Sequence, residues 1–158
     1  YRLAPNLSLT QLLSNVTVSN GIAFSEDENI MYFADTPTGR IQKFEYTKNF
    51  NKFYELETNM IFKNVGEPDG ATVDIDNNYW SARVRGKCII CVDTKDETII
   101  EKISLPTNTP TCVTFGGANL NSLYITSLRA DPTIDNEGGN LHKIETSTQG
   151  RAQLLADI

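Results

Sequence analysis

The sequence has no excess of positive charge and no long hydrophobic run, and each absence removes a class of function. The 158 residues carry a formal net charge of −6, whereas proteins that bind the phosphate backbone of nucleic acid are normally basic. The longest apolar clusters, such as Ile-Ile-Cys-Val at residues 89–92, are far shorter than a membrane-spanning segment. We therefore expect neither nucleic acid nor a membrane as a partner.

Several well-known catalytic and binding motifs are also missing. The sequence contains no GxSxG nucleophile elbow and no GxxxxGK[ST] phosphate-binding loop. Residues 74–78 begin like a calcium-binding EF-hand loop, but its sixth position is Tyr79 rather than Gly and its twelfth is Arg85 rather than Glu. We interpret this segment as a hairpin turn. His142, the only histidine, lies in an alternating strand pattern and is not expected to be catalytic.

The chain has three cysteines, of which two form a CxxC pattern at Cys88 and Cys91. The segment between them is β-branched and apolar, which favours a strand. A strand turns residues i and i+3 to opposite faces and separates their Cα atoms by roughly 10 Å, more than the approximately 7 Å that a disulfide spans. We therefore expect neither a redox pair nor a zinc site here.

The compartment is less constrained by the sequence. An odd, unpatterned cysteine count favours a reducing compartment, so we expect a cytoplasmic protein. The triplets Asn6-Leu7-Ser8 and Asn15-Val16-Thr17 are glycosylation acceptors in a secreted protein, which leaves secretion open. The sequence begins at Tyr1, without an initiator Met or a signal-peptide pattern, and we expect a processed product or a fragment.

Three segments repeat the same order of short strands and polar turns. They are SNGIAFSEDENIMYFADTPTGRIQKFEY (19–46), PDGATVDIDNNYWSARVRGKCIICVD (68–93) and PTCVTFGGANLNSLYITSLR (110–129) continued by GGNLHKIE (138–145). Further strands are expected at FYELE, TIIEKISL and AQLLADI. Repeats of 40–50 residues with four short strands each are typical of a β-propeller. An ordinary β-sandwich is the alternative, and no amphipathic helix pattern is visible.

Propeller geometry brings polar residues of the three repeats together. The first strand of each repeat is innermost, so the residues just before these strands converge on one mouth of the central channel. These residues are Asn20, Asp69 and Thr111. The second strands end at the same mouth and bring Asp35, Arg83 and Arg129 near it. The long loop at residues 129–139 follows the last of these strands and is a candidate lid or specificity loop.

The motifs SNG, PDG and PT-C-FGG, in this order and at these intervals, resemble the C-terminal half of the SMP-30/gluconolactonase/regucalcin family over nearly the whole chain. The resemblance implies an all-β six-bladed propeller, of which residues 1–158 form a single domain holding roughly three blades. It also implies one divalent metal ion in the channel. Calcium is the ion expected, with zinc, magnesium or manganese as alternatives.

Two residues match functional positions of the family. Asn20 matches a metal ligand, and Asp69 matches a second metal ligand that is also the proposed general acid/base. The family's third ligand, a Glu, and its main substrate-contacting residues lie in the N-terminal half, which this sequence does not include. We expect substrate binding by Thr111, Arg83 and Arg129, and their positions in the repeats are the only ground for this expectation. Arg83 stands where the family usually has a small or apolar residue.

The function that the resemblance implies is a calcium-type lactonase that opens a sugar lactone or a related ester. The alternative is a non-catalytic calcium-binding or interaction module, because Asn-Gly and Pro-Asp-Gly are also common turn signals. Three blades alone leave unpaired strand edges, which favour self-association. The sequence does not identify the lactone.

Overall fold

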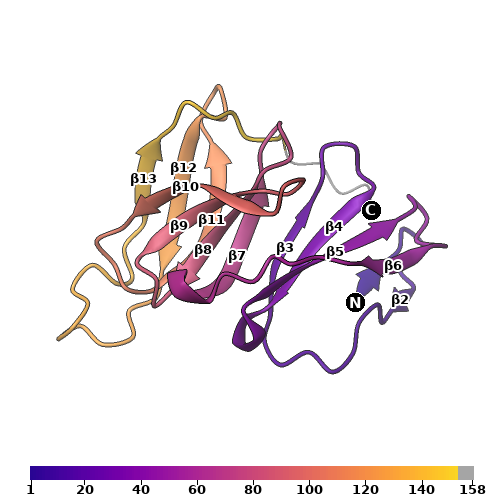
Figure 1. The fold of residues 1–158 in the computed structure, drawn as a ribbon, viewed down its shortest axis with the longest axis horizontal. Helices are drawn as coiled ribbons and strands as arrows, with labels where there is room; N and C mark the ends of the chain where they lie inside the picture. Colours follow the sequence, from indigo (N-terminus) through magenta and orange to yellow (C-terminus); the bar gives the residue numbers. More distant parts are fainter. Residues whose placement is uncertain (153–158) are drawn as a thin grey trace.

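A computed structural model describes residues 1–152 of the chain, whose regular secondary structure consists almost entirely of antiparallel strands (Figure 1). The first sheet contains β3 (Ser19–Phe24), β4 (Ile30–Asp35), β5 (Arg40–Tyr46) and β6 (Phe53–Leu56). The second contains β7 (Glu67–Val73), β8 (Tyr79–Val84), β9 (Cys88–Asp93) and β10 (Thr98–Ser104). The third contains β11 (Pro110–Gly116), β12 (Ser122–Ser127) and β13 (His142–Glu145). The expected all-β class is confirmed.

Each sheet pairs its strands in chain order, as expected for successive hairpins. Two short 3₁₀ turns, η1 (Thr36–Thr38) and η2 (Lys63–Val65), lie in the connections. A small N-terminal hairpin of β1 (Arg2–Leu3) and β2 (Leu9–Thr10) was not predicted. The fourth strand expected at AQLLADI falls on residues 153–158, apart from its first residue, and so lies outside the described residues. No helix within residues 1–152 is long and apolar enough to cross a membrane.

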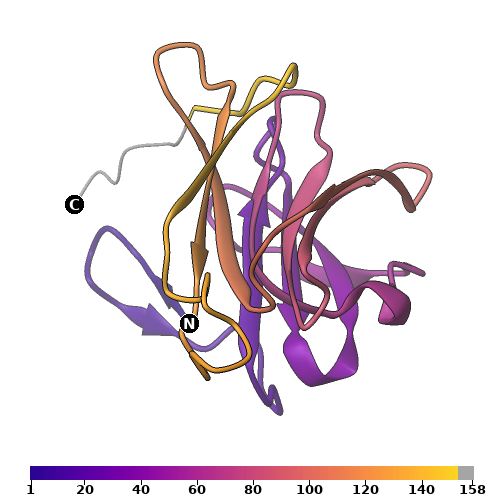
Figure 2. The same ribbon diagram turned by 90° about the vertical axis from the view of Figure 1, so that its left-hand side faces the viewer.

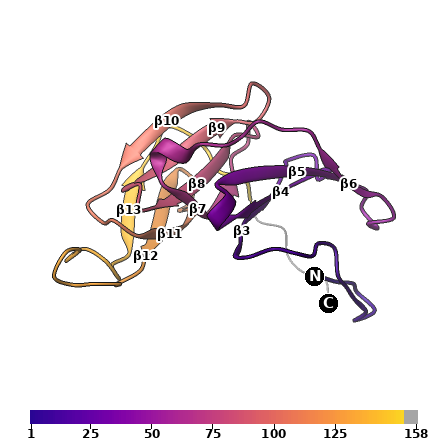
Figure 3. The ribbon, with the colours of Figure 1, turned by 60° about the horizontal axis from the view of Figure 1, so that its bottom comes forward.

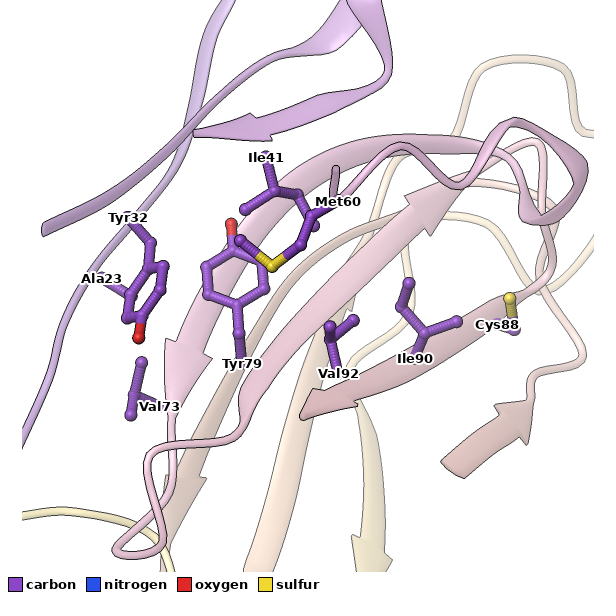
Figure 4. Close-up of a cluster of buried hydrophobic side chains, with 9 residues drawn as sticks. All are labelled: Ala23, Tyr32, Ile41, Met60, Val73, Tyr79, Cys88, Ile90 and Val92. Atoms are coloured by element: carbon purple, nitrogen blue, oxygen red, sulfur yellow. The ribbon is translucent and has the colours of Figure 1, made fainter. Parts of the chain in front are cut away.

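The core lies between the sheets, because the two middle strands of the second sheet, β8 and β9, are buried on both faces. One cluster joins the first and second sheets and includes Tyr32, Ile41, Met60 and Tyr79 (Figure 4). A second cluster joins the second and third sheets around Trp80, whose ring packs edge-on against Phe115. Burial of this kind stabilises a fold by about 25 cal/mol per Å² of apolar surface, so neighbouring sheets hold one another in place.

The strand predicted for the CxxC segment is confirmed as β9. Cys88 faces the first cluster and Cys91 faces the second, so the two thiols lie on opposite faces of β9, and both are buried and free. Trp80 is buried, and its indole Nε1 donates to Asp74 Oδ2 at 2.9 Å. The CxxC pattern is therefore part of the core.

The first strands of the three sheets lie side by side, with β7 in contact with both β3 and β11 (Figure 3). Near its C-terminal end the described chain returns across the sheets, where Gly150 bridges to Asp74 and Arg151 donates to the carbonyl oxygens of Phe24 and Ser25 at 3.0 and 2.7 Å. Figure 2, seen from the side of the third sheet, shows the sheets behind one another. This arrangement brings the starts of three inner strands to one end of the molecule.

Candidate functional site

Each inner strand carries one extra residue close to its start. On β3, Asn20 pairs with Ala34 but the next pair is Ala23 with Tyr32, so three steps along β3 oppose two along β4. The same irregularity occurs between Pro68 and Ala71 on β7 and between Pro110 and Cys112 on β11. Such β-bulges re-aim side chains and are common beside functional sites. The three positions singled out in the sequence, Asn20, Asp69 and Thr111, all lie at these bulges.

Asn20 is held by a hydrogen-bond chain that crosses from the first sheet to the second. Its Nδ2 donates to Thr36 Oγ1 at 2.8 Å, and Thr36 Oγ1 donates to the carbonyl oxygen of Pro68 at 2.8 Å. A hydroxyl has one proton to donate, so Thr36 accepts from the amide of Asn20. This fixes which end of the amide is nitrogen. Within residues 1–152, Oδ1 of Asn20 accepts no hydrogen bond and is available to a ligand.

Asp69 is half-buried and lies beside Asn20. Burial raises the pKa of the Asp69 carboxyl, while hydrogen bonds from the Gly70 backbone and the Asn20 side chain lower it, and the net direction is upward. A carboxylate accepts hydrogen bonds and does not donate them, so Asn20 contacts Asp69 through Nδ2. Its Oδ1 therefore stays free of both neighbours. A raised pKa is characteristic of a carboxyl group suited to exchanging protons.

Glycine follows both residues because the fold leaves no room for a side chain there. Gly21 has φ +60°, and a Cβ at this position would lie 2.2 Å from Tyr79 Oη. A Cβ on Gly70 would lie 2.6 Å from Cys112 Sγ. Real Cβ atoms do not approach this closely, so these close contacts between neighbouring sheets require glycine.

Thr111 and Arg129 are less directly connected to this centre. Thr111 Oγ1 lies 2.9 Å from Thr126 Oγ1 of the adjacent strand, so the hydroxyl is bonded within its own sheet. Arg129 is exposed in the loop between β12 and β13, which projects from the third sheet in Figure 3. Their roles in substrate binding stay predictions.

The structure places Arg83 inside the protein rather than at a surface where substrate could reach it. Its side chain is 0% exposed, and Nη2 donates to the carbonyl oxygens of Phe62 and Gly66 at 3.0 and 2.6 Å. Nε and Nη1 form no hydrogen bond within residues 1–152. Burial lowers the pKa of Arg83 to about 10. This position does not support direct substrate binding, and it indicates that Arg83 holds the segment that leads into β7.

Arg83 has counterparts in the other two sheets. Asp35 accepts from the backbone N–H groups of Thr17 and Val18 at 3.1 and 2.8 Å, and the bond from Val18 is the main reason that the pKa of Asp35 is lowered. Asp135 accepts from the backbone N–H of Asn108 at 2.6 Å. In each sheet a charged side chain beyond or near the end of the second strand thus fixes the segment before the inner strand. In the second sheet the charge of this side chain is positive rather than negative, and Arg83 donates to carbonyl groups.

Sequence reasoning missed three residues of this centre. Thr36 follows the second strand of its repeat and had no motif to mark it. Asp135 lay within the predicted long loop without a role, and Tyr79 was considered only as the sixth position of an EF-hand-like loop. Only contacts between residues distant in sequence reveal their parts, because each bonds to a residue at least 16 positions away.

A cavity of ≈ 430 Å³ runs along the inner strands beyond the centre. Residues of β3, β7 and β11 line it, among them Ile22, Ala71 and Cys112, and Arg151 lies at its edge. Its lining is mainly apolar, with Thr72 and Thr114 as polar groups. A small molecule bound at Asn20 and Asp69 would have this space beside it.

The donors at the centre fit a hard divalent cation. Asn20 offers an amide oxygen and Asp69 a carboxylate, the ligand types that calcium prefers. Within residues 1–152 no group of three or more His, Cys, Asp or Glu side chains could hold a metal ion. Asn20 and Asp69 are thus two candidate oxygen ligands that come from two different sheets.

Comparisons with known proteins agree with the sequence resemblance. The family model described as the SMP-30/Gluconolactonase/LRE-like region matches residues 1–129. The pentonolactonase XacC of Haloferax volcanii is 28% identical over 168 residues, covering 100% of this chain and 57% of that protein. The 6-deoxy-6-sulfogluconolactonase of Pseudomonas putida is 36% identical over 125 residues, covering 78% of this chain and 43% of that protein.

Solved structures show the same arrangement of strands. A luciferin-regenerating enzyme superposes with a TM-score of 0.82 at 28% identity, covering 95% of this chain and 52% of that one. The chain spans about half the length of the curated relatives that it matches.

Proposed function

The chain belongs to the SMP-30/gluconolactonase/LRE-like family, and we propose that it is part of a metal-dependent hydrolase that opens a sugar lactone or a related ester. The observation that carries this proposal is the pairing of Asn20 with Asp69 at matching bulges of two neighbouring sheets, with the amide orientation set by Thr36. Relatives that are named lactonases support the substrate class.

In this proposal the three sheets are consecutive blades of a six-bladed propeller, and residues 1–158 form one domain with the remaining blades. Asn20 Oδ1 and the Asp69 carboxylate would hold the cation, with calcium the first expectation. The family resemblance assigns the third protein ligand, a Glu, to the other half of the ring. A bound divalent cation would polarise the lactone carbonyl group.

The residues of this chain would bind, orient and exchange protons. Asp69 would accept a proton from the attacking water through the carboxylate oxygen that does not bind the cation. The Thr36 hydroxyl accepts from the Asn20 amide nitrogen and so leaves Oδ1 for the cation. The apolar cavity along β3, β7 and β11 would exclude water from the body of the substrate. Arg83 would act at a distance by holding the approach to Asp69.

The test is hydrolysis of gluconolactone by the full-length protein, followed by proton release in calcium and in EDTA. We expect Asn20→Ala and Asp69→Ala to abolish turnover and the rise in melting temperature that calcium gives. The matched control is Asp76→Asn, since Asp76 is exposed and lies just beyond the opposite end of β7. Unchanged turnover in Asp69→Ala, or turnover that EDTA does not reduce, would contradict the proposal.

A further inference from the structure

The two candidate ligands also form the Asn-Gly and Asp-Gly dipeptides of this sequence. Among its 15 asparagines only Asn20 precedes a glycine, and among its 10 aspartates only Asp69 does. Glycine after Asn or Asp offers no side chain to hinder its own backbone nitrogen, which can therefore reach the preceding side-chain carbonyl carbon. Both reactive dipeptides in the described sequence thus lie in one centre.

Neither glycine can be replaced by a larger residue in this fold. A Cβ on Gly21 would meet Tyr79 Oη at 2.2 Å, and a Cβ on Gly70 would meet Cys112 Sγ at 2.6 Å and the carbonyl oxygen of Thr111 at 2.8 Å. The close approach of neighbouring sheets therefore keeps a small residue beside each ligand. The close packing that positions Asn20 and Asp69 therefore also keeps beside each of them the glycine that makes it chemically vulnerable.

The bulges add a second condition for reaction. Between Asn20 and Ala23, and again between Pro68 and Ala71, one residue of the inner strand has no pairing partner on the next strand. The regular ladder is interrupted at these places. The backbone nitrogen atoms of Gly21 and Gly70 therefore lie at interruptions of the ladder, although the Gly21 carbonyl group still accepts a hydrogen bond from Tyr79 Oη at 2.8 Å.

We propose that Asn20–Gly21 and Asp69–Gly70 are sites of spontaneous succinimide formation, and that the hydroxyl of Thr36 slows the reaction at Asn20. At Asn20 the Gly21 nitrogen bonds to Cγ, and ammonia leaves with the peptide proton. At Asp69 the Gly70 nitrogen bonds to Cγ of the acid, and water leaves. Water then opens either ring at one of its two carbonyl groups, giving aspartate or isoaspartate.

Thr36 restrains Asn20 directly. The leaving nitrogen, Nδ2, donates to Thr36 Oγ1 at 2.8 Å, and that hydroxyl is itself fixed by its bond to the carbonyl oxygen of Pro68 at 2.8 Å. In this proposal the bond to Thr36 slows the reaction because it restrains the amide nitrogen that has to leave. Asp69 has no bond of this kind to Thr36, so its reaction is not slowed by the hydroxyl.

Either conversion would alter the centre covalently. Reaction at Asn20 replaces a neutral amide by a carboxylate next to Asp69, and each isoaspartate adds a methylene group to the main chain. The inference goes beyond the proposed function, because it needs no bound metal and no substrate. It would stand if the protein hydrolysed no lactone.

The experiment is prolonged incubation of the folded full-length protein at neutral pH and physiological temperature in EDTA. Peptide mass mapping follows the loss of each amide, and labelling by an isoaspartyl methyltransferase locates isoaspartate. The wild type is compared with Thr36→Val, which removes the hydroxyl, with Thr36→Ser, which restores it, and with Thr111→Val, which removes the hydroxyl at the third bulge. A thermal melt of each variant confirms that it is folded.

In the wild type we expect Asn20 to lose its amide before any other asparagine of residues 1–152, and isoaspartate to appear at position 69. Thr36→Val should accelerate loss at Asn20 several-fold, whereas Thr36→Ser and Thr111→Val should match the wild type. Faster loss at another asparagine, or no isoaspartate at position 69, would overturn the assignment of sites. Equal rates in Thr36→Val and Thr36→Ser, or equal acceleration in Thr111→Val, would overturn the role of Thr36.

Discussion

The hydroxyl of Tyr79 donates a hydrogen bond to the carbonyl oxygen of Gly21 at 2.8 Å, joining the second sheet to the first directly behind Asn20. Tyr79 is 0% exposed, and burial raises the pKa of its phenol, so the group stays a neutral donor. Gly21 reaches this bond only in a left-handed conformation, with φ +60°. The orientation of the first candidate ligand thus depends on an aromatic side chain from the neighbouring sheet.

Replacing Tyr79 by Phe should destabilise the protein by about 1–3 kcal/mol, because the buried Gly21 carbonyl group loses its partner. The measurement is urea unfolding of both proteins. Tyr54→Phe is the matched control, since Tyr54 is 46% exposed and its loss of a hydroxyl should change stability by less than about 0.5 kcal/mol. Equal stability of the two variants would show that the Tyr79 bond contributes nothing.

Asp69→Asn should stabilise the metal-free protein at neutral pH, by about 0.5–2 kcal/mol, as replacement of a residue kept for function often does. The folded pKa of Asp69 is raised by burial, so the folded state binds this proton more tightly than the unfolded state does. Ionised Asp69 therefore costs stability, and the cost appears as the pH rises through the folded pKa.

The check is a series of melts in EDTA across acid and neutral pH. The difference between Asp69→Asn and the wild type should be largest at neutral pH and should disappear in acid, where Asp69 is protonated in both states. If Asp69→Asn were instead less stable than the wild type at neutral pH, with the deficit disappearing in acid, the pKa would be lowered rather than raised.

Much of the fold follows from local sequence pattern. The strands of each repeat were predictable because apolar residues, polar turns and aromatic positions recur at similar spacing, and pairing between consecutive strands follows from short connections. The opposite faces of Cys88 and Cys91 followed from the period of a strand alone. The N-terminal hairpin was not predictable, because Leu3 and Leu9 are exposed and carry no core pattern.

The candidate site was only partly accessible to the same reasoning. Their positions in the repeat identified Asn20 and Asp69 as candidate ligands, and a glycine inside a strand is a sign of a bulge. Thr36 and Tyr79 act across sheets, however, and no local pattern encodes a contact with a residue 32 or 58 positions away. Arg83 shows a different limit, because its position in the repeat is near the mouth while its burial could not be predicted from that position.

The difference between the two arginines can be tested by substitution. Arg83→Ala should lower the free energy of unfolding by roughly 2–4 kcal/mol, since it leaves the Phe62 and Gly66 carbonyl groups without a donor and creates a cavity. Arg129→Ala removes an exposed side chain and should stay within about 0.5 kcal/mol of the wild type. Denaturant unfolding of both variants measures this, and a stable Arg83→Ala protein would contradict the structural role of Arg83.

The three cysteines should differ in reactivity. Cys88 and Cys91 are buried in opposite clusters, whereas Cys112 is exposed beside Gly70 and lines the cavity along the inner strands. Desolvation raises the pKa of the Cys112 thiol, and the nearby charge of Asp69 adds to this. The thiolate is the reactive form, so Cys112 should react slowly at neutral pH and faster as the pH rises.

A chromogenic disulfide reagent on the native chain of residues 1–158 should therefore titrate Cys112 alone, and all three thiols after unfolding in urea. Cys112→Ser should abolish the native reaction while leaving the two thiols seen in urea. Asp69→Asn should make the native reaction faster at neutral pH, because removing the neighbouring negative charge lowers the pKa of Cys112. Rapid native labelling of Cys88 or Cys91 would contradict the packing of β9 between the first and third sheets. An unchanged rate in Asp69→Asn would show that the charge of Asp69 does not act on Cys112.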